Sequence, residues 1–216
     1  MRINVLSLFP EIIKVYSNTS IIGRAVKKGL VDINIYDFRN FGVGERKTVD
    51  GKPYGGGGGM VIRVDVVSRA LKKIKTDDPK TKTILLCPTG KTYGQNDAAD
   101  YSKLDSITII CGHYQGFDSR IYKLVDNIVS IGNYITTGGE PAALAVADSV
   151  IRLIPNVINR ESLENETFSQ NLTEAPLFTE PADFEGDRVP EIILSGHHAN
   201  IASFREKNRK KISPNK

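Results

Sequence analysis

Residues that build disulfide frameworks and metal centres are scarce in this sequence. Its 216 residues include two cysteines, three histidines and no tryptophan. Cys87 and Cys111 each close an apolar run, which is where a buried free thiol is usually found in a reducing compartment. We therefore expect neither a disulfide nor a metal site, and we predict a cytoplasmic location.

Long apolar runs are absent from the sequence as well. No segment approaches the roughly 18 uninterrupted apolar residues that a membrane-spanning helix requires. The first ten residues hold one charged side chain followed by a short alternating apolar stretch, which predicts a strand and not a signal peptide. With 40% apolar and 25% charged residues, the composition is typical of a soluble globular protein without a membrane partner.

Positive charge is concentrated at the C-terminal end. Residues 205–216 include six basic residues and one acidic residue, a net charge of +5, whereas the other 204 residues include 23 basic and 24 acidic ones. Such a cluster indicates either contact with a polyanion or a solvated terminus that is kept basic for solubility. The charge pattern alone leaves both interpretations open.

Short apolar runs alternate with segments of helical periodicity along most of the chain. Strands separated by helices imply crossover connections, and hence a mainly parallel sheet with helices on both faces. We therefore predict the α/β class. The expected strands cover residues 3–8, 31–38, 84–87, 107–111 and 127–130, and the expected helices cover 12–29, 61–74 and 141–153.

Polar turns that contain glycine follow the last three of these strands, at residues 87–90, 112–118 and 130–140. Ligands of parallel sheets bind outside the C-terminal strand ends, so we expect these turns to meet at one site. The last turn leads into a helix. Either the first N–H groups of this helix bind a ligand, or the turn is only a tight connection between a strand and a helix. We interpret Gly138 and Gly139 as positions where backbone approaches a flat ligand.

Five consecutive glycines, residues 55–59, are the most unusual local feature. A run without side chains forms a flexible lid or allows something large to lie against its backbone. The residues that follow, Met60 and Val61, do not match the Gly-Lys-Ser/Thr of a phosphate-binding P-loop. Ser7-Leu8-Phe9-Pro10 follows the first strand, so the glycine loops of dinucleotide folds and class I methyltransferases are excluded there.

The composition changes near residue 154. We predict a first domain over residues 1–160, an acidic interdomain linker over 161–172 and a small second domain over 173–216. Roughly 45 residues are too few for an independent core. The second domain should therefore pack against the first domain or against a partner subunit.

Five segments of the chain together show a family resemblance. In order and spacing they resemble the motifs of the bacterial tRNA (guanine-N1)-methyltransferases, the TrmD family of the SPOUT superfamily. The resemblance implies a SPOUT domain with a C-terminal trefoil knot, a small, mostly helical and shortened C-terminal tRNA-binding domain, and a homodimer with active sites at the subunit interface. The segments cover residues 49–61, 87–90, 110–120, 130–140 and 194–199.

The same resemblance implies the ligands and the residues that hold them. The cofactor would be S-adenosyl-L-methionine, with Mg²⁺ as a further cofactor that the family allows, and the substrate would be guanosine 37 of tRNA. The implied substrate-binding residues are Asp50, Gly58, Gly59, His197 and Arg205. The implied cofactor-binding residues are Leu86, Cys87, Pro88, Gly112, Tyr114, Gln115, Ser130, Ile131, Gly132, Tyr134, Thr136, Gly138 and Gly139.

Methylation of guanine N1 needs a base and a cation. N1 is a poor nucleophile while protonated, so a general base must remove the proton while negative charge builds on O6. A carboxylate of ordinary pKa is a weak base for this purpose, so a cation near O6 must assist. By resemblance Arg152 stabilises O6, and Glu166 is the base where the family has an aspartate. Alternatively, Glu166 is one solvated linker acid beside Glu161 and Glu164.

Departures from the family pattern keep other functions open. His113 stands where the family has arginine and Gln115 where it has glutamate, which changes the charge of this loop. Tyr54, Tyr114 and Tyr134 are expected to pack within the protein rather than to stack on bases. The alternative functions are a SPOUT methyltransferase that acts on another RNA and a catalytically weak RNA-binding paralogue.

Overall fold

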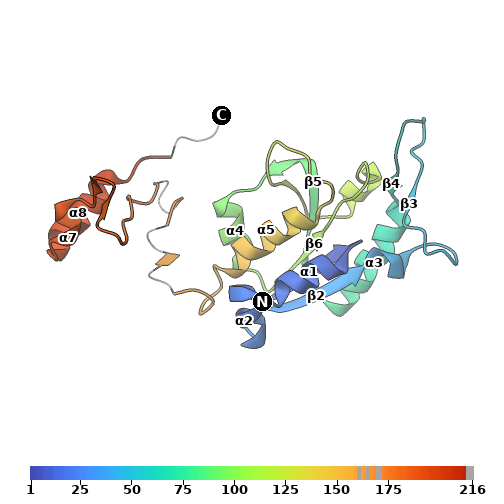
Figure 1. The fold of residues 1–216 in the computed structure, drawn as a ribbon. Coiled ribbons are helices and arrows are strands. Elements are labelled where there is room, and N and C mark those ends of the chain that lie inside the picture. The colour runs from blue at the N-terminus through green and yellow to red at the C-terminus, as the bar shows by residue number, and fades with distance from the viewer. Residues whose placement is uncertain (160–161, 164–165, 169–171, 213–216) are drawn as a thin grey trace. The chain divides into compact units, whose positions relative to one another are not determined.

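The chain folds into two compact units, Met1–Ile158 and Asn159–Lys216. The structure, shown in Figure 1, is a computed structural model that describes residues 1–159, 162–163, 166–168 and 172–212.

The first unit contains β1–β7, α1–α5 and two short 3-10 helices. Its helices are α1 (Pro10–Ser17), α2 (Ser20–Lys27), η1 (Phe38–Phe41), α3 (Val64–Asp77), α4 (Gln95–Ser102), η2 (Ser119–Lys123) and α5 (Glu140–Ile151). Its strands are β1 (Arg2–Ser7), β2 (Asp32–Asp37), β3 (Asp50–Gly51), β4 (Val61–Ile62), β5 (Lys82–Thr92), β6 (Ser106–Ile110) and β7 (Asn127–Ser130).

Five of these strands form one sheet in the order β2-β1-β6-β5-β7. Every neighbouring pair is parallel, and β1 lies between β2 and β6 with Val5 opposite both Ile35 and Ile109. Parallel strands cannot be joined by tight hairpins, so α1 and α2 connect β1 to β2, and α4 connects β5 to β6. The predicted mainly parallel α/β architecture is confirmed.

Side chains of the strands alternate between two hydrophobic cores, one on each face of the sheet. Ile3 and Val5 of β1 belong to the core that includes buried residues of α1, α2 and α5, whereas Leu6 belongs to the core under α3. In β5, Leu85 likewise points away from the core of its neighbours Ile84 and Leu86. This two-residue period explains why strands buried on both faces read as continuous apolar runs.

The predicted helix over 61–74 is wrong at its start. Val61 and Ile62 form β4, which pairs antiparallel with Asp50–Gly51, and α3 begins only at Val64. The extended conformation continues through Arg63, whose N–H donates to the Val49 carbonyl at 3.0 Å. Pairing with a distant strand therefore overrides the local apolar periodicity that favours a helix.

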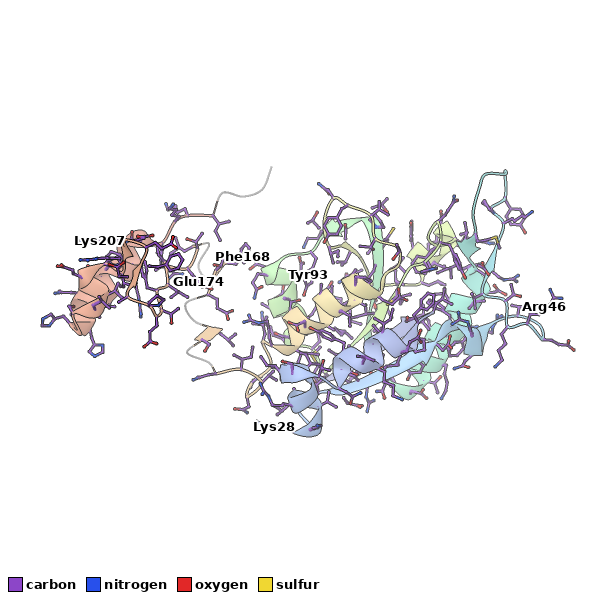
Figure 2. The ribbon with its side chains drawn as sticks, viewed as in Figure 1. Lys28, Arg46, Tyr93, Phe168, Glu174 and Lys207 are labelled. Carbon is purple, nitrogen blue, oxygen red and sulfur yellow. The ribbon has the colours of Figure 1, made fainter. Side chains whose placement is uncertain are left out.

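The predicted end of a strand at Cys87 is also wrong, because β5 continues to Thr92. The pairing of β5 with β7 is irregular between Leu86 and Lys91, so the expected turn at 87–90 is a bulge within the strand. A Cβ atom at Gly90 would lie 2.5 Å from the Val129 nitrogen of β7, which leaves no room for a side chain there. Tyr93 follows β5 and its hydroxyl bonds to Ser149 Oγ of α5 at 2.7 Å (Figure 2).

Helix α5 begins at a buried carboxylate. Glu140 is 2% exposed, and Ser7 Oγ, at the end of β1, donates a hydrogen bond to Glu140 Oε1 at 2.7 Å. The N–H of Phe9 in turn donates to Ser7 Oγ at 2.8 Å. A negative charge in the first turn of a helix is also favoured by the helix dipole. This chain of bonds joins the C-terminal end of the central strand to the first turn of α5.

Replacing Ser7 with alanine is expected to destabilise the first unit. A hydrogen bond to a charged group contributes about 1.5–3 kcal/mol, and its loss leaves a buried carboxylate oxygen without this donor. We expect the midpoint of thermal unfolding to fall by about 4–8 °C. The matched control is Ser102→Ala, since Ser102 Oγ donates only to the neutral Ala99 carbonyl of its own helix. Equal midpoints for the two variants would contradict the role of the Ser7–Glu140 bond.

The second unit contains a short hairpin and two helices among its described residues. Two contacts join the segment that begins at Leu172 to the segment after α8. Leu172 pairs with Lys211 as an isolated bridge, and the Thr173 N–H donates to the Lys210 carbonyl at 2.8 Å. Across both units, the described helices include none that is long and apolar enough to cross a membrane. The elements of the second unit are β8 (Asp183–Phe184), β9 (Asp187–Arg188), α7 (Glu191–Leu194) and α8 (His198–Asn208).

Candidate active site

A cavity of about 540 Å³ lies at the C-terminal edge of the sheet in the first unit. The bulge of β5 at 87–90, the loop after β6 and the loop between β7 and α5 form its walls. Leu86, Val129 and Ala142 contribute apolar surface, and hydroxyl groups such as that of Ser130 contribute polar atoms. A concave site of this size with apolar walls and a few polar groups fits a small organic cofactor.

Two backbones in van der Waals contact form one wall of the cavity. The N–H of Gly139 donates to the Gly112 carbonyl at 2.7 Å, and His113 pairs with Gly138 as an isolated antiparallel bridge. A Cβ atom at Gly139 would lie 2.5 Å from the Gly112 nitrogen and 2.8 Å from Cys111 Cα. Gly139 is therefore required where the chain packs against its own backbone.

The interpretation of Gly138 and Gly139 as room for a flat ligand needs correction. A Cβ atom at Gly138 would lie 2.5 Å from Glu140 Oε2 and 2.9 Å from His113 Nδ1, which are atoms of the protein. Both glycines line the cavity, but the atoms that exclude a side chain belong to the loop after β6 and to α5. In the sequence, a glycine that makes room for a ligand looks the same as a glycine that makes room for another segment of the protein.

Hydrogen bonds within the loop between β7 and α5 hold its shape. Ser130 Oγ donates to the Gly132 carbonyl at 3.0 Å, and Thr136 Oγ1 donates to the Gly138 carbonyl at 2.7 Å. The ring of Tyr134 lies over Gly132, where an added Cβ atom would be 2.5 Å from its edge. The loop is thus organised by its own polar groups and holds Tyr134 at the cavity.

Cys87 lies in the cavity wall and is only half-buried, contrary to the expectation of a buried thiol. Its sulfur bonds to Thr89 Oγ1 at 3.2 Å and to the Tyr122 hydroxyl at 3.6 Å. Burial raises the pKa of the Cys87 thiol, but the bonds from Thr89 and Tyr122 outweigh burial and lower it overall. Cys111, in contrast, is fully buried, and burial together with the charge of Glu140 raises the pKa of its thiol.

His113 connects the cavity to the core. Its ring contacts Phe9, with ring centroids 5.1 Å apart, and Tyr114 in an edge-to-face arrangement at 4.7 Å. Nδ1 of His113 is buried and accepts or donates no hydrogen bond within the described residues. The ring is therefore held mainly by aromatic contacts.

All thirteen residues predicted to bind the cofactor lie in the wall of this one cavity. The structure adds nine lining residues. Six of them lie within the motif segments 87–90, 110–120 and 130–140 but were not assigned to the cofactor, and the other three, Tyr122, Val129 and Ala142, lie outside these segments. The added lining residues are Thr89, His113, Gly116, Phe117, Tyr122, Val129, Ile135, Thr137 and Ala142.

The hairpin of β3 and β4 includes three predicted substrate-binding residues, Asp50, Gly58 and Gly59, none of which lines the cavity. Asp50 lies close enough for its charge to act on Tyr114, whose pKa is raised by burial and then by Asp50. A Cβ atom at Gly59 would lie 2.8 Å from the side chain of Gln115, a cavity residue. The hairpin and the cavity therefore share a boundary.

The predicted catalytic residues belong to different units. Arg152 is the C-cap of α5 in the first unit, and its N–H donates to the Asp148 carbonyl at 3.0 Å. Glu166, His197 and Arg205 belong to the second unit, with Arg205 in the last turn of α8. The alternative acids for Glu166, residues 161 and 164, lie outside the described residues.

Among the residues that the structure describes, no three or more His, Cys, Asp or Glu side chains form a group that could hold a metal ion. Mg²⁺ is usually bound by one or two carboxylates together with substrate phosphates, so the Mg²⁺ that the resemblance implies stays a prediction.

Comparison with known proteins covers nearly the entire chain. The chain is 48% identical to the tRNA (guanine-N(1)-)-methyltransferase of Malacoplasma penetrans, over 99% of this chain and 95% of the relative. It is 46% identical to those of Clostridium botulinum and Geobacillus kaustophilus, over 95% and 96% of this chain and 86% of each relative. The family model described as tRNA (Guanine-1)-methyltransferase TrmD matches residues 1–215. The chain belongs to the TrmD family of tRNA (guanine-1)-methyltransferases.

Proposed function

We propose that this protein transfers a methyl group from S-adenosyl-L-methionine to N1 of guanosine 37 in tRNA. The observation that supports this most directly is the meeting of three loops at one cavity of about 540 Å³, next to the glycine-rich hairpin. The family to which the chain belongs gives the class of reaction, methyl transfer to guanine N1 of tRNA, and the relatives are named for that reaction. We place the activity in the cytoplasm.

The cavity has the composition that this cofactor requires. Leu86, Val129 and Ala142 offer apolar contact to an adenine ring, and Tyr134 provides an aromatic face beside it. Ser130 and Thr136 line the polar part of the wall, near the glycines that hold two backbones together. When bound, S-adenosyl-L-methionine would supply an electrophilic methyl group.

The protein's own residues must manage a proton and a developing charge. Glu166 accepts the proton of guanine N1, which makes N1 nucleophilic. As the N1–H bond breaks, negative charge spreads to O6, and the guanidinium of Arg152 stabilises it there. A carboxylate has an ordinary pKa of about 4.3, so the cation at O6 is needed to make this proton transfer favourable.

Assembly forms part of the same proposal. We assign Arg152 and Glu166 of one active site to two subunits of a homodimer, with 161–172 as the linker between the domains 1–160 and 173–216. The proposal includes a C-terminal trefoil knot in the first domain, in the part of the chain where Gly138 and Gly139 contact the loop after β6. Basic residues around Arg205 suit the second domain to the tRNA backbone.

Single-turnover methylation of tRNA transcripts tests the substrate. We expect transfer of isotope-labelled methyl groups to a transcript with guanosine at position 37 and no transfer when adenosine replaces it. Transfer that is independent of guanosine 37 would favour a methyltransferase acting on another RNA, and the absence of any transfer would favour an RNA-binding paralogue.

A further inference from the structure

Tyr54 is the most exposed aromatic residue among those described. Its side chain is 100% exposed, which contradicts the expectation that it packs within the protein. It lies at the start of the turn of the β3–β4 hairpin, which extends beyond the sheet in Figure 1. A fully exposed ring is free to contact a flat ligand, and such a contact gains free energy by burying it.

The first three glycines after Tyr54 are required by backbone conformation and not by packing. Gly55, Gly56 and Gly57 have φ values of +86°, +83° and +113°, which side chains rarely adopt. A Cβ atom at Gly55, Gly56 or Gly58 would meet nothing within 4 Å. This stretch therefore offers bare backbone next to an exposed ring, with hardly any apolar side-chain area for a protein partner to bury.

The base of the hairpin is fixed to the cavity wall. The N–H of Ile62 donates to the Gly116 carbonyl at 2.9 Å, and that of Gln115 donates to the Met60 carbonyl at 3.0 Å. The N–H of Asp118 donates to the Ile62 carbonyl at 3.1 Å. The base of the hairpin is therefore bonded to the same loop that forms one wall of the cavity.

Two arginines lie beside the base of the hairpin. Arg63 directly follows Ile62 of β4 and pairs with Asp65 at 2.9 Å. Arg120 pairs with Asp118, whose N–H donates to the Ile62 carbonyl at 3.1 Å. The side chains of Arg63 and Arg120 remain 40% and 67% exposed, so both can contact a further anion. Arg46 lies on the neighbouring loop (Figure 2).

We propose that Tyr54 stacks on one unpaired nucleobase that flanks the target guanosine, while Arg63 and Arg120 contact the phosphates beside it. Aromatic stacking accepts any base, since every base has a flat face, and nearby cations neutralise the backbone. A polyanion with splayed bases meets all three features of this surface: the exposed ring, the bare glycine backbone and the two arginines. The inference rests on the proposed function, because it takes tRNA as the substrate.

Fluorescence of 2-aminopurine tests the stacking. The probe is placed in a tRNA transcript immediately 5' or 3' of the target guanosine, and the full chain is added with saturating S-adenosylhomocysteine. We expect quenching of at least one of the two probes by the unmodified protein and by Tyr54→Phe, and loss of that quenching in Tyr54→Ala. The dissociation constant for tRNA should rise about 5- to 100-fold in Tyr54→Ala, with affinity for the cofactor product unchanged.

Salt dependence tests the two arginines. Arg63→Gln and Arg120→Gln should each weaken tRNA binding for all sequences and lower the slope of affinity against salt by about one. The control is Arg2→Gln, because Arg2 forms a similar exposed ion pair with Asp32, 3.0 Å apart, at the opposite ends of the strands. Slopes equal to that of the control would overturn the phosphate contacts.

Failure of the stacking and failure of the proposed function are seen separately. Unchanged quenching and tRNA affinity in Tyr54→Ala would overturn the stacking even if the protein methylates guanosine 37. Quenching that depends on Tyr54 would support it even if no methyl group is transferred. Loss of cofactor-product affinity in Tyr54→Ala would also overturn it, by assigning Tyr54 to the cavity.

Discussion

Replacing Gly139 with alanine is expected to lower the affinity for S-adenosyl-L-methionine by about 5- to 150-fold. The new Cβ atom would lie 2.5 Å from the Gly112 nitrogen and 2.9 Å from the Cys111 carbonyl carbon. These are backbone atoms, which cannot rotate aside as a side chain can, so the two walls must separate. Overpacking of this kind costs about 1–3 kcal/mol or more, and about 2.7 kcal/mol corresponds to 100-fold in affinity.

Calorimetric titration measures this effect, and Gly94→Ala provides the control. Gly94 has φ of −142°, and a Cβ atom there would meet nothing within 4 Å. The Gly94→Ala protein should bind the cofactor with the same affinity as the unmodified protein. A folded Gly139→Ala protein that binds the cofactor as tightly as Gly94→Ala would show that the contact between the two loops does not shape the site.

Arg152→Ala and Glu166→Gln are expected to slow methyl transfer while leaving cofactor binding intact. Removing a group that stabilises charge in the transition state costs about 10²–10³ in kcat, and removing a general base costs about 10²–10⁴. We therefore expect single-turnover rates at least about 100-fold lower for each variant, with cofactor affinity within about threefold of the original value. Glu166→Asp keeps a carboxylate and should retain more activity than Glu166→Gln.

Matched variants separate chemistry from general charge effects. Arg24→Ala removes an arginine from the last turn of α2, and Glu174→Gln removes a charge from a residue of the second unit that accepts a bond from the Thr167 N–H at 3.2 Å. Both should methylate at the unmodified rate. Full activity in Glu166→Gln would remove Glu166 from the role of base and return it to the solvated acids of the linker.

Much of the sheet could be predicted from the sequence because its strands are buried on both faces. The strands β1, β6 and β7 can be predicted from their apolar runs without knowledge of distant residues. In the structure, all three lie within one or two residues of the predicted bounds. The bulge of β5 and the loops after β6 and β7 converge because parallel strands share one C-terminal edge. The thirteen predicted cofactor residues thus meet at one cavity through topology that short-range patterns can indicate.

Other features depend on contacts between distant residues. Val61 and Ile62 have helical periodicity, yet they pair with Asp50–Gly51 and with the loop after β6. Gly139 looks like any glycine before a helix, and only the packing against Gly112 shows why it is required. The sequence predicts that Tyr54 packs within the protein. The ring is exposed instead, at the start of a turn whose glycines have positive φ.

Mapping of the methylated product tests whether this protein methylates N1 of guanosine 37, as we propose. A tRNA transcript is incubated with the full chain and isotope-labelled S-adenosyl-L-methionine, digested to nucleosides and to fragments, and analysed by mass spectrometry. We predict one labelled methyl group, present as 1-methylguanosine and confined to the fragment that contains position 37. A methyl group on another atom of guanine, or in a fragment without position 37, would contradict it.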